Sequence, residues 1–326
     1  MGKDWDKEPI DKESLNIRTS CPESTTATLT DVFILSSDNK GKNFSGKDGK
    51  STRRDGKDFR RDERPAAPKK QYYKDPVEVD EGELGGLVIG RNAVRELLKS
   101  GRAVDKLLVS RGDREGSIVM LVAQAIERGI PVVEVDRAKL DGMAGMSQHQ
   151  GIIAMAAEKE YCSVEDIIAI ARERGEAPLI VISDGITDPY NLGSLIRCAE
   201  GVGAHGLIIP KRRASGLTPL VSKSSAGAIE HLAVAKVSNI AQTIEELKEQ
   251  NIWVYAAEAG GQAYYETDFT GGCAIVFGSE GEGVSQLVKQ RSDVIVSIPM
   301  YGHVNSFNVS TAAAVILAEV SKQHRS

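Results

Sequence analysis

The second half of the chain consists of short, almost continuously apolar segments that alternate with segments of helical period. The apolar segments are APLIVISD (177–184), GLIIP, LAVAKV, IWVYAAEA, CAIVFG and DVIVSIP. Apolar runs of this length are typical of parallel strands that are buried on both faces. Helical segments such as IAQTIEELKEQ lie between them, so the alternation predicts an α/β fold, a mostly parallel sheet with helices on both faces.

A smaller alternating unit precedes this series. Its segments are GLVIGRNAVRELLKSG, VDKLLVS, SIVMLVAQAIERG, PVVEVD, RAKLDGMAG and GIIAMAA. They predict a small α/β domain over residues 85–158, followed by a linker helix over 159–176 and the main domain over 177–326.

The first 84 residues show neither period and are expected to be a disordered arm. The net charge of −5 hides an asymmetry, because residues 40–74 carry 13 Lys and Arg against 5 Asp and Glu, whereas residues 75–85 carry five acids and no base. A basic arm on an acidic body is suited to binding a polyanion. A solvated linker would have the same composition, and the charge pattern alone leaves both readings open.

Composition argues against several other classes of protein. The four cysteines, Cys21, Cys162, Cys198 and Cys273, form no CxxC pair, so we expect no metal site and no disulfide framework. No segment reaches the roughly 18–20 consecutive apolar residues of a membrane span, and the N-terminus has no apolar signal region. We therefore expect a cytoplasmic protein with no membrane partner.

One glycine motif is misleading. GVGAHG (201–206) matches the G-x-G-x-x-G pattern of dinucleotide-binding proteins. That pattern binds a dinucleotide only where it follows a strand and opens a helix. Here it closes a predicted helix and opens the strand LIIP, so it is interpreted as a helix end and a turn.

Three polar loops follow buried strands, at the strand ends where open α/β sheets place their ligands. DGITDPYNLGSLIRCAE (184–200) contains a turn at Asp188-Pro189, a predicted helix N-cap at Asn191, and Arg197 within the helix. A planar guanidinium such as that of Arg197 can pair with a phosphate. Taken alone, the segment is equally compatible with a helix cap and a surface arginine.

The second loop, FGSEGEG (277–283), combines glycines that allow close approach to a ligand with the acids Glu280 and Glu282. A carboxylate at Glu280 is unsuited to facing a phosphate, but it can accept hydrogen bonds from hydroxyl or amino groups. Glu282 is interpreted as a first-turn acid that stabilises the next helix. The loop therefore favours a neutral or cationic ligand group.

The third loop, SIPMYGHVNSFNVSTAAAV (297–315), enters a helix of small residues. Ser306, Asn308 and Ser310 surround the predicted helix start, and N-capping accounts for one of them but not for all three. His303 could act as a base, but it stands in a Gly- and Asn-containing loop, and we interpret it as a surface residue or one that faces RNA.

Together the three loops resemble motifs 1, 2 and 3 of the SpoU/TrmH-type RNA 2′-O-ribose methyltransferases of the SPOUT superfamily. The resembling segments are DPYNLGSLIR, FGSEGEGVS and IPMYGHVNSFNVSTAAA. The resemblance covers residues 86–322. VIGRNAVRELL, HQGIIA and the segment between motifs 1 and 2 resemble the branch that methylates a guanosine of 23S rRNA. That branch usually has Leu at the position of Phe307. The replacement of Leu by Phe keeps an apolar contact.

The resemblance implies a C-terminal trefoil knot, a homodimer and S-adenosylmethionine as the methyl donor. It implies that the cofactor is bound by residues of motifs 2 and 3, namely Gly278, Ile298, Met300, Phe307 and Asn308. Catalytic residues carried over from the motifs are Asn191, Arg197, Glu280, Ser306 and Asn308.

Arg197 is the residue that the resemblance names as activator of the ribose hydroxyl, with help from a substrate phosphate. A guanidinium with a pKa above about 12 is a poor base. Binding the phosphate and stabilising the developing alkoxide are physically easier roles. In the implied arrangement Glu280 and Asn191 orient Arg197, while Ser306 and Asn308 hold the loop and the nucleotide.

RNA contacts are expected from Arg197 and from the basic segment Lys211, Arg212 and Arg213, with the arm over 40–74 as a further polyanion contact. Two alternatives to a 23S rRNA methyltransferase stay open. The same transfer could act on tRNA, or the chain could be an RNA-binding ribosome-assembly factor without catalysis. The complete set of motif residues argues against the second.

Overall fold

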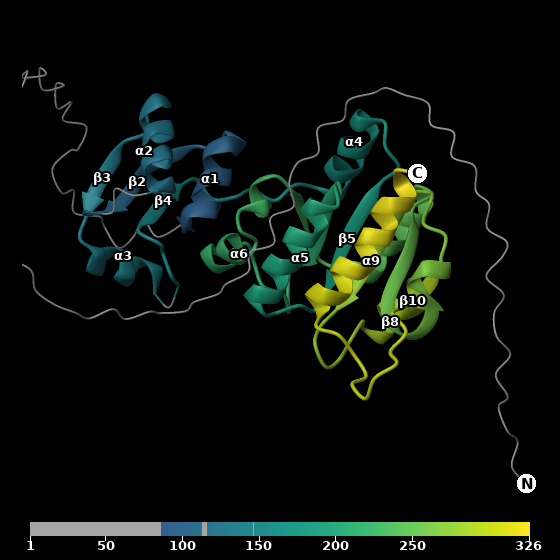
Figure 1. Cartoon of the computed structure of the whole chain (residues 1–326). Coiled ribbons are helices and arrows are strands. Elements are labelled where there is room, and N and C mark those ends of the chain that lie inside the picture. The colour runs from purple at the N-terminus through teal and green to yellow at the C-terminus, as the bar shows by residue number, and fades with distance from the viewer. Residues whose placement is uncertain (1–85, 113–115, 146) are drawn as a thin grey trace, which may run out of the picture. The chain divides into compact units, whose positions relative to one another are not determined.

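The computed structural model describes residues 86–112, 116–145 and 147–326. Within these residues the backbone forms a four-stranded sheet and a six-stranded sheet, each covered by helices (Figure 1). The first described strand, β1, is Leu87–Ile89, in the segment where the sequence predicts that folded structure begins. The predicted arm over residues 1–84 lies outside the described residues.

The first sheet has the strand order β1-β4-β2-β3. β4 pairs antiparallel with both β1 and β2, while β2 and β3 are parallel. The remaining strands are β2 (Val104–Ser110), β3 (Val132–Val135) and β4 (Ile152–Ala156).

Helices cover both faces of this sheet. They are α1 (Arg91–Ser100), α2 (Ser117–Glu127) and α3 (Arg137–Ala144). Val94 and Leu97 of α1 pack with Leu121 of α2 in one apolar cluster, and Leu140 of α3 packs in the cluster on the opposite face. The segment is therefore α/β, as its alternating pattern predicts.

The second sheet has the order β10-β8-β9-β5-β6-β7, and all of its neighbouring strands are parallel. This confirms the mostly parallel sheet expected from the apolar runs. The strands are β5 (Leu179–Asp184), β6 (Gly206–Pro210), β7 (Ala233–Val237), β8 (Trp253–Ala263), β9 (Cys273–Gly278) and β10 (Val294–Ser297).

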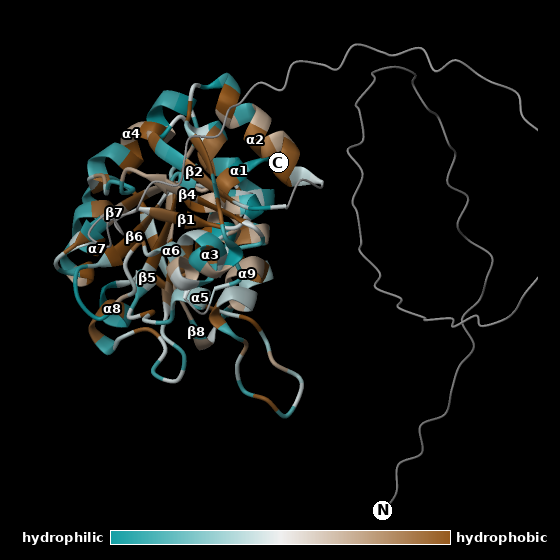
Figure 2. Ribbon diagram, turned by 90° about the vertical axis from the view of Figure 1, so that its left-hand side faces the viewer, coloured by the Kyte–Doolittle hydropathy of each residue, from teal (hydrophilic) through white to brown (hydrophobic). Residues whose placement is uncertain are grey.

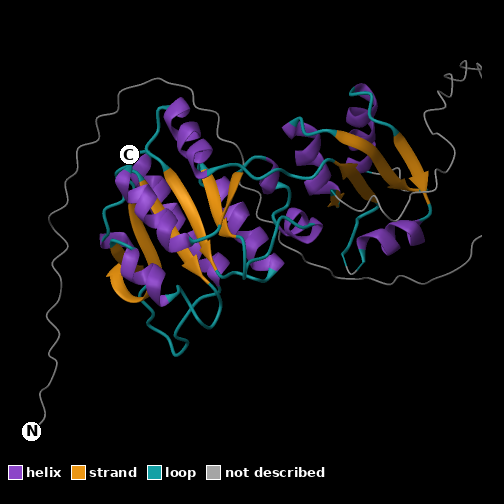
Figure 3. Ribbon diagram, turned by 180° about the vertical axis from the view of Figure 1, so that it is seen from behind, coloured by secondary structure: helices purple, strands orange, loops and turns teal. Residues whose placement is uncertain are grey.

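The helices of the second sheet divide between its faces, as expected for a parallel sheet buried on both sides (Figure 3). α5, α6 and α9 contribute to the apolar cluster on one face, and α4, α7 and α8 to the cluster on the other. The strands between the two sets of helices are largely hydrophobic, as their brown colour shows (Figure 2). The helices are α4 (Val164–Arg174), α5 (Pro189–Gly201), α6 (Pro219–Ser224), α7 (Ile240–Glu249), α8 (Gln286–Arg291) and α9 (Val309–His324). Two short 3₁₀ turns, Ala228–Glu230 and Tyr264–Glu266, precede β7 and β9.

The start of α5 differs from the prediction. Asp188, not Asn191, is its N-cap, because the Asp188 carboxylate accepts a hydrogen bond from the Asn191 backbone N–H at 2.9 Å. Pro189 takes the first helical position, where a missing N–H costs nothing. The side chain of Asn191 is therefore released from capping and is available to the site.

Two further local expectations need correction. Glu282 lies in the loop and not in the first turn of a helix, because α8 begins only at Gln286. The helix α6, capped by Thr218 and led by Pro219, was not expected from its polar, Ser-rich sequence. The interpretation of GVGAHG is confirmed, since Gly201 is the last residue of α5 and Gly206 is the first of β6.

No helix in the described ranges is long and apolar enough to cross a membrane. The trefoil knot implied by the resemblance stays a prediction, and so do the domain boundaries at residues 85, 158 and 177.

Candidate active site

The three polar loops follow β5, β9 and β10, at the end of the six-stranded sheet where the carboxyl ends of these strands lie. β9 lies between β5 and β8, and β10 lies beside β8. Because all four strands are parallel, the loops that follow β5, β9 and β10 emerge at their shared carboxyl edge. Ligands of open α/β sheets bind at this kind of edge.

Asn308 joins the three loops. Its side-chain Nδ2 donates to Asn191 Oδ1 at 3.0 Å and to Glu280 Oε1 at 2.5 Å. Its Oδ1 accepts from the Ser310 backbone N–H at 2.9 Å and from the Ser310 hydroxyl at 2.5 Å, so Asn308 also caps α9. The side-chain amide of Asn308 thus forms hydrogen bonds with residues of all three motifs. These bonds fix which way the amide oxygen and nitrogen point.

The second loop is closed on itself. Ser279 and Gly283 exchange two backbone hydrogen bonds, of 3.2 and 3.0 Å, and Gly281 and Gly283 have φ angles of 90° and 68°. A side chain is strained at such angles, so the glycines are required by the turn. A Cβ on Gly278 would lie 2.0 Å from the Gly283 carbonyl carbon, which shows how closely the two ends of the loop approach.

A cavity of about 620 Å³ lies beside this loop. Every predicted cofactor-binding residue lines it, as do the predicted catalytic residues Glu280 and Ser306. The residues in question are Gly278, Glu280, Ile298, Met300, Ser306, Phe307 and Asn308. Its size falls within the roughly 300–1,000 Å³ of small-molecule sites. The structure therefore brings motifs 2 and 3 together around one cavity.

Both apolar and acidic residues line the cavity. Val296, Val309 and Ile316 supply aliphatic surface, whereas Glu258 and Glu280 supply carboxylates. In the described ranges no group of three or more His, Cys, Asp or Glu side chains could hold a metal ion. This donor set suits an organic ligand with an apolar part and a cationic part.

Arg197 lies apart from this cluster. Arg197 is exposed on α5. Within the described residues it forms no hydrogen bond to Glu280 or Asn191. The side chains of those two residues instead accept hydrogen bonds from Asn308. The positive charge of Arg197 acts on its neighbour Cys198. Burial raises the pKa of the Cys198 thiol, and the charge of Arg197 opposes that shift.

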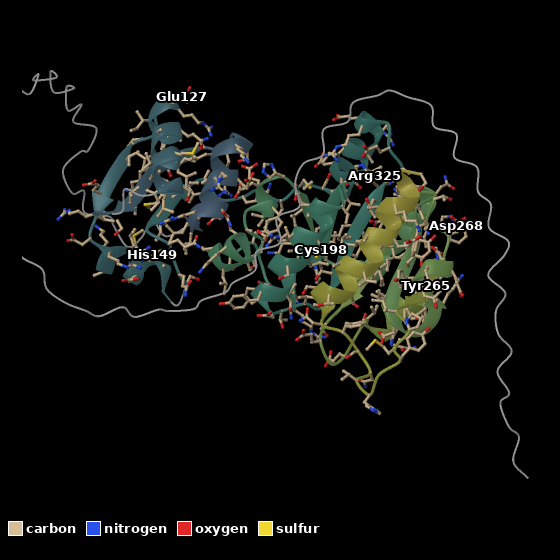
Figure 4. The ribbon with its side chains drawn as sticks, viewed as in Figure 1. Glu127, His149, Cys198, Tyr265, Asp268 and Arg325 are labelled. Carbon is tan, nitrogen blue, oxygen red and sulfur yellow. The ribbon has the colours of Figure 1, made fainter. Side chains whose placement is uncertain are left out.

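Cys198 also links two helices of the site. Its thiol donates to the Ser310 carbonyl at 3.6 Å, so the middle of α5 contacts the first turn of α9 (Figure 4). The contact holds α5, which carries Asn191 and Arg197, against α9, the helix that Asn308 caps.

The predicted RNA-binding residues Lys211, Arg212 and Arg213 are exposed in the loop after β6. The Lys211 backbone N–H donates to the Val237 carbonyl at 2.7 Å, and Arg213 has a φ of 55°. Further along this loop, Ser215 N–H donates to Ile186 O at 3.0 Å, so the loop packs against the segment that leads into α5. His303 is also exposed, in the loop before α9.

Two carboxylates of the site were not expected from the sequence. Asp184 Oδ2 accepts from Ser285 N–H at 2.8 Å, and Glu258 Oε2 accepts from Val284 N–H at 3.0 Å. Asp184 follows an apolar run, which is a signal that could have found it. Glu258 likewise follows an apolar run, IWVYAA, but the loop that it contacts depends on β8 lying next to β9.

Comparison with known proteins gives the class of the chain. The model of the SpoU rRNA Methylase family matches residues 178–318, and that of the RNA 2′-O ribose methyltransferase substrate binding domain matches residues 87–162. The chain therefore belongs to the SpoU/TrmH family of RNA methyltransferases.

Individual relatives agree with this assignment. YacO of Bacillus subtilis, named as a TrmH family tRNA/rRNA methyltransferase, is 44% identical over 237 residues, which are 72% of this chain and 95% of that protein. A TrmH family protein of Staphylococcus haemolyticus is 42% identical over 73% of this chain and 96% of its own length.

A solved structure shares the fold. The SpoU methyltransferase AviRb of Streptomyces viridochromogenes, crystallised with the cofactor AdoMet, has a TM-score of 0.62 at 26% identity, over 74% of this chain and 90% of that one. A structure titled RNA 2′-O ribose methyltransferase has the same TM-score at 25% identity, over 74% and 89% of the two chains.

Proposed function

We propose that this chain transfers a methyl group from S-adenosylmethionine to a ribose 2′-OH of RNA, and that its substrate is a guanosine of 23S rRNA. The observation that carries the proposal is the hydrogen-bonded cluster of Asn191, Glu280 and Asn308 at a cavity of about 620 Å³. The cluster unites residues of all three motifs of an RNA methyltransferase family.

The cavity fits the proposed cofactor. Its aliphatic wall suits an adenine ring, its glycine loop exposes backbone groups, and its acids suit the positive charge of a sulfonium. Gly278, Ile298, Met300, Phe307 and Asn308 would hold it. When bound, S-adenosylmethionine supplies an electrophilic methyl carbon. AviRb, which shares the fold, was crystallised with this cofactor.

The residues of the chain position the reacting ribose. Asn308 fixes Asn191 and Glu280, so these side chains need little rearrangement when substrate binds. Arg197 lies six residues beyond Asn191 on α5, about 9 Å along a helix that rises ~1.5 Å per residue. From there its exposed guanidinium binds a phosphate beside the reacting ribose and stabilises the alkoxide that forms as the hydroxyl loses its proton.

RNA as the substrate is supported by the family of the N-terminal segment, whose model is a substrate-binding domain. The exposed Lys211, Arg212 and Arg213 supply phosphate contacts. Such a substrate would place the enzyme in the cytoplasm. The 23S rRNA guanosine rests on the resemblance of the segment between motifs 1 and 2.

We propose in addition that the enzyme is a knotted homodimer. Tyr301, Val304 and Phe307 are 91%, 67% and 46% exposed in the loop that borders the cavity, and Tyr190 at the start of α5 is 58% exposed. Exposed apolar side chains that gather near a site are typical of an interaction surface. A second copy of the chain would cover them.

The nearest alternative is the same reaction on tRNA, since the name of YacO includes both kinds of RNA. The other alternative is an RNA-binding assembly factor without catalysis. The contact of Asn308 with Asn191 and Glu280 favours catalysis, because an assembly factor has no need of it.

Two measurements on the purified protein test the proposal. Calorimetric titration with S-adenosylhomocysteine should show binding at one site per chain, and tritiated methyl groups should be transferred to unmodified 23S rRNA. Nucleoside mass spectrometry should then identify a 2′-O-methylated product. Binding without any transfer to rRNA or tRNA would favour the assembly factor, and a base-methylated product would contradict the proposed reaction.

A further inference from the structure

Two carboxylates flank the strand end from which the glycine loop departs. In the sheet Asp184 of β5 is the register partner of Gly278, the last residue of β9. On the other side Ala257 of β8 is the partner of Phe277, so Glu258 follows at the level of Gly278. The two acids thus stand on either side of the residue that opens the loop.

Each carboxylate accepts a backbone N–H from the end of the same loop. Glu258 Oε2 binds Val284 N–H at 3.0 Å, and Asp184 Oδ2 binds the next amide, Ser285 N–H, at 2.8 Å. Lys289 of α8 adds an ion pair to Glu258 Oε2 at 3.5 Å. Hydrogen bonds to ionised groups are about twice as strong as those between neutral groups, so the loop exit is held firmly.

The chain passes very close to Glu258. A Cβ on Gly283 would lie 2.5 Å from Glu258 Oε2, so the backbone at this point fits against the carboxylate only because the residue is glycine. Val284 is 1% exposed and packs in the apolar cluster with Val288. The exit of the loop is therefore fixed from one side by apolar packing and from the other by the two acids.

Glu258 also belongs to the cavity wall, together with Gly278, Glu280 and Gly283. Its second oxygen, Oε1, accepts no hydrogen bond from the described residues, although Oε2 binds Val284 and Lys289. The side chain is 26% exposed. Glu258 therefore both holds the glycine loop and lines the cavity beside it.

We propose that Glu258 and Asp184 are positioning residues for the glycine loop, and that the hydrogen bond from Val284 to Glu258 sets the affinity for S-adenosylmethionine. The inference rests on the proposed function of the cavity. By holding Val284 and Ser285, the two acids fix the loop over residues 279–283, so that Glu280 meets Asn308 and the cavity keeps its shape.

The test compares Glu258→Ala with Glu258→Gln, whose amide oxygen can still accept the Val284 N–H. Asp184→Ala removes the acceptor of the Ser285 N–H. Glu249→Ala, which replaces an exposed acid on α7, is the matched control. Affinity for S-adenosylhomocysteine is measured by calorimetry, KM for each substrate by methyl transfer, and folding by thermal unfolding.

Glu258→Ala should weaken S-adenosylhomocysteine binding about tenfold or more and raise the KM for S-adenosylmethionine by a similar factor, because the Val284 N–H loses its acceptor. Asp184→Ala should weaken binding in the same direction, because the Ser285 N–H loses its acceptor. The KM for RNA should be unchanged. Glu258→Gln, which keeps an acceptor oxygen, and the control Glu249→Ala should stay within about threefold of the parent protein.

Parent-like binding by Glu258→Ala would overturn the inference, and so would a Gln variant as impaired as the Ala variant. An equal rise in both KM values would also contradict it. A parent protein that binds no S-adenosylhomocysteine would instead contradict the proposed function itself, so the two failures can be told apart.

Discussion

At the scale of single residues, the site separates a rigid hydrogen-bonded group from an exposed arginine. Asn191 and Glu280 both accept hydrogen bonds from Asn308, whereas Arg197 is exposed and forms no hydrogen bond with any of the three. This arrangement favours separate roles for the hydrogen-bonded group and for Arg197. We propose that the hydrogen-bonded group shapes the cofactor cavity and its rim, and that Arg197 acts on the RNA.

We therefore expect Arg197→Ala to abolish methyl transfer and to leave S-adenosylhomocysteine affinity within about threefold of the parent value. The reason is that Arg197 does not line the cavity. Single-turnover methyl transfer and calorimetry measure the two effects. A strong loss of cofactor affinity in this variant would refute the division of roles.

Asn308 has two functions that one substitution can separate. Asn308→Asp keeps an oxygen that caps the Ser310 N–H, so the helix start is preserved. It removes the Nδ2 donor to Asn191 and places a carboxylate beside Glu280. Methyl transfer should fall by about a hundredfold or more, as expected when like charges replace a charge-assisted bond.

The unfolding temperature of Asn308→Asp should change by only a few degrees, since the cap is kept, whereas Asn308→Ala should lose about 1 kcal/mol of helix stability as well. Thermal unfolding of both variants distinguishes them. An active Asn308→Asp enzyme would show that the bridge to Asn191 and Glu280 is dispensable.

At the scale of helices and strands, apolar runs predicted the second sheet well. CAIVFG is β9, Cys273–Gly278, and APLIVISD contains β5, Leu179–Asp184. A buried parallel strand needs apolar residues on both faces, so its sequence is distinctive. The short helix α6 was missed, because its start depends on the Thr218 cap and on packing of Val221 into the core.

The candidate site was predictable in part. Its cavity residues came from motifs in single loops, and the structure gathers them as expected. The partners of each side chain were not predictable. Asn191 was expected to be a cap, but Asp188 takes that position, and the contact of Glu258 with Val284 depends on the pairing of β8 with β9. Contacts between strands far apart in sequence leave no local pattern.

The junction between β5 and β6 supplies a prediction about pH. His205 is 3% exposed, its Nδ1 accepts from Leu179 N–H at 2.9 Å, and its Nε2 lies 2.9 Å from Glu176 Oε2. Burial lowers the pKa of His205 below its ordinary value of 6.5, although the hydrogen bond to Glu176 opposes this. The folded protein therefore favours the neutral ring.

Because the unfolded chain takes up the proton first, the contribution of His205 to stability is complete above pH 6.5 and is lost as the pH falls below that value. Denaturant unfolding between about pH 5 and pH 8, the range in which His titrates, should show this loss. In His205→Asn, whose side-chain oxygen can replace Nδ1, the slope in this range should diminish. An unchanged slope would assign the effect to another group.

At the scale of the whole molecule, the sequence carries a basic segment before the described residues. Residues 40–74 carry 13 Lys and Arg against 5 Asp and Glu. Phosphate contacts made by such a segment release counterions, so affinity falls with salt in proportion to their number. Deletion of residues 1–80 should weaken RNA binding and flatten its dependence on salt.

Fluorescence anisotropy with an rRNA fragment, over a series of salt concentrations, measures both effects of the deletion. S-adenosylhomocysteine affinity is the control and should not change, because every residue that lines the cavity lies beyond position 256. An unchanged salt slope would show that the arm makes no phosphate contact in the complex.

Mapping of 2′-O-methyl groups in cellular RNA tests whether this protein methylates a ribose of 23S rRNA, as we propose. Ribosomal and transfer RNA would be compared from a strain with the gene, a strain without it, and the deleted strain carrying Arg197→Ala. We expect that one 2′-O-methylguanosine of 23S rRNA disappears on deletion and is not restored by Arg197→Ala. Loss of a methyl group from tRNA alone, or no change in either RNA, would contradict the proposal.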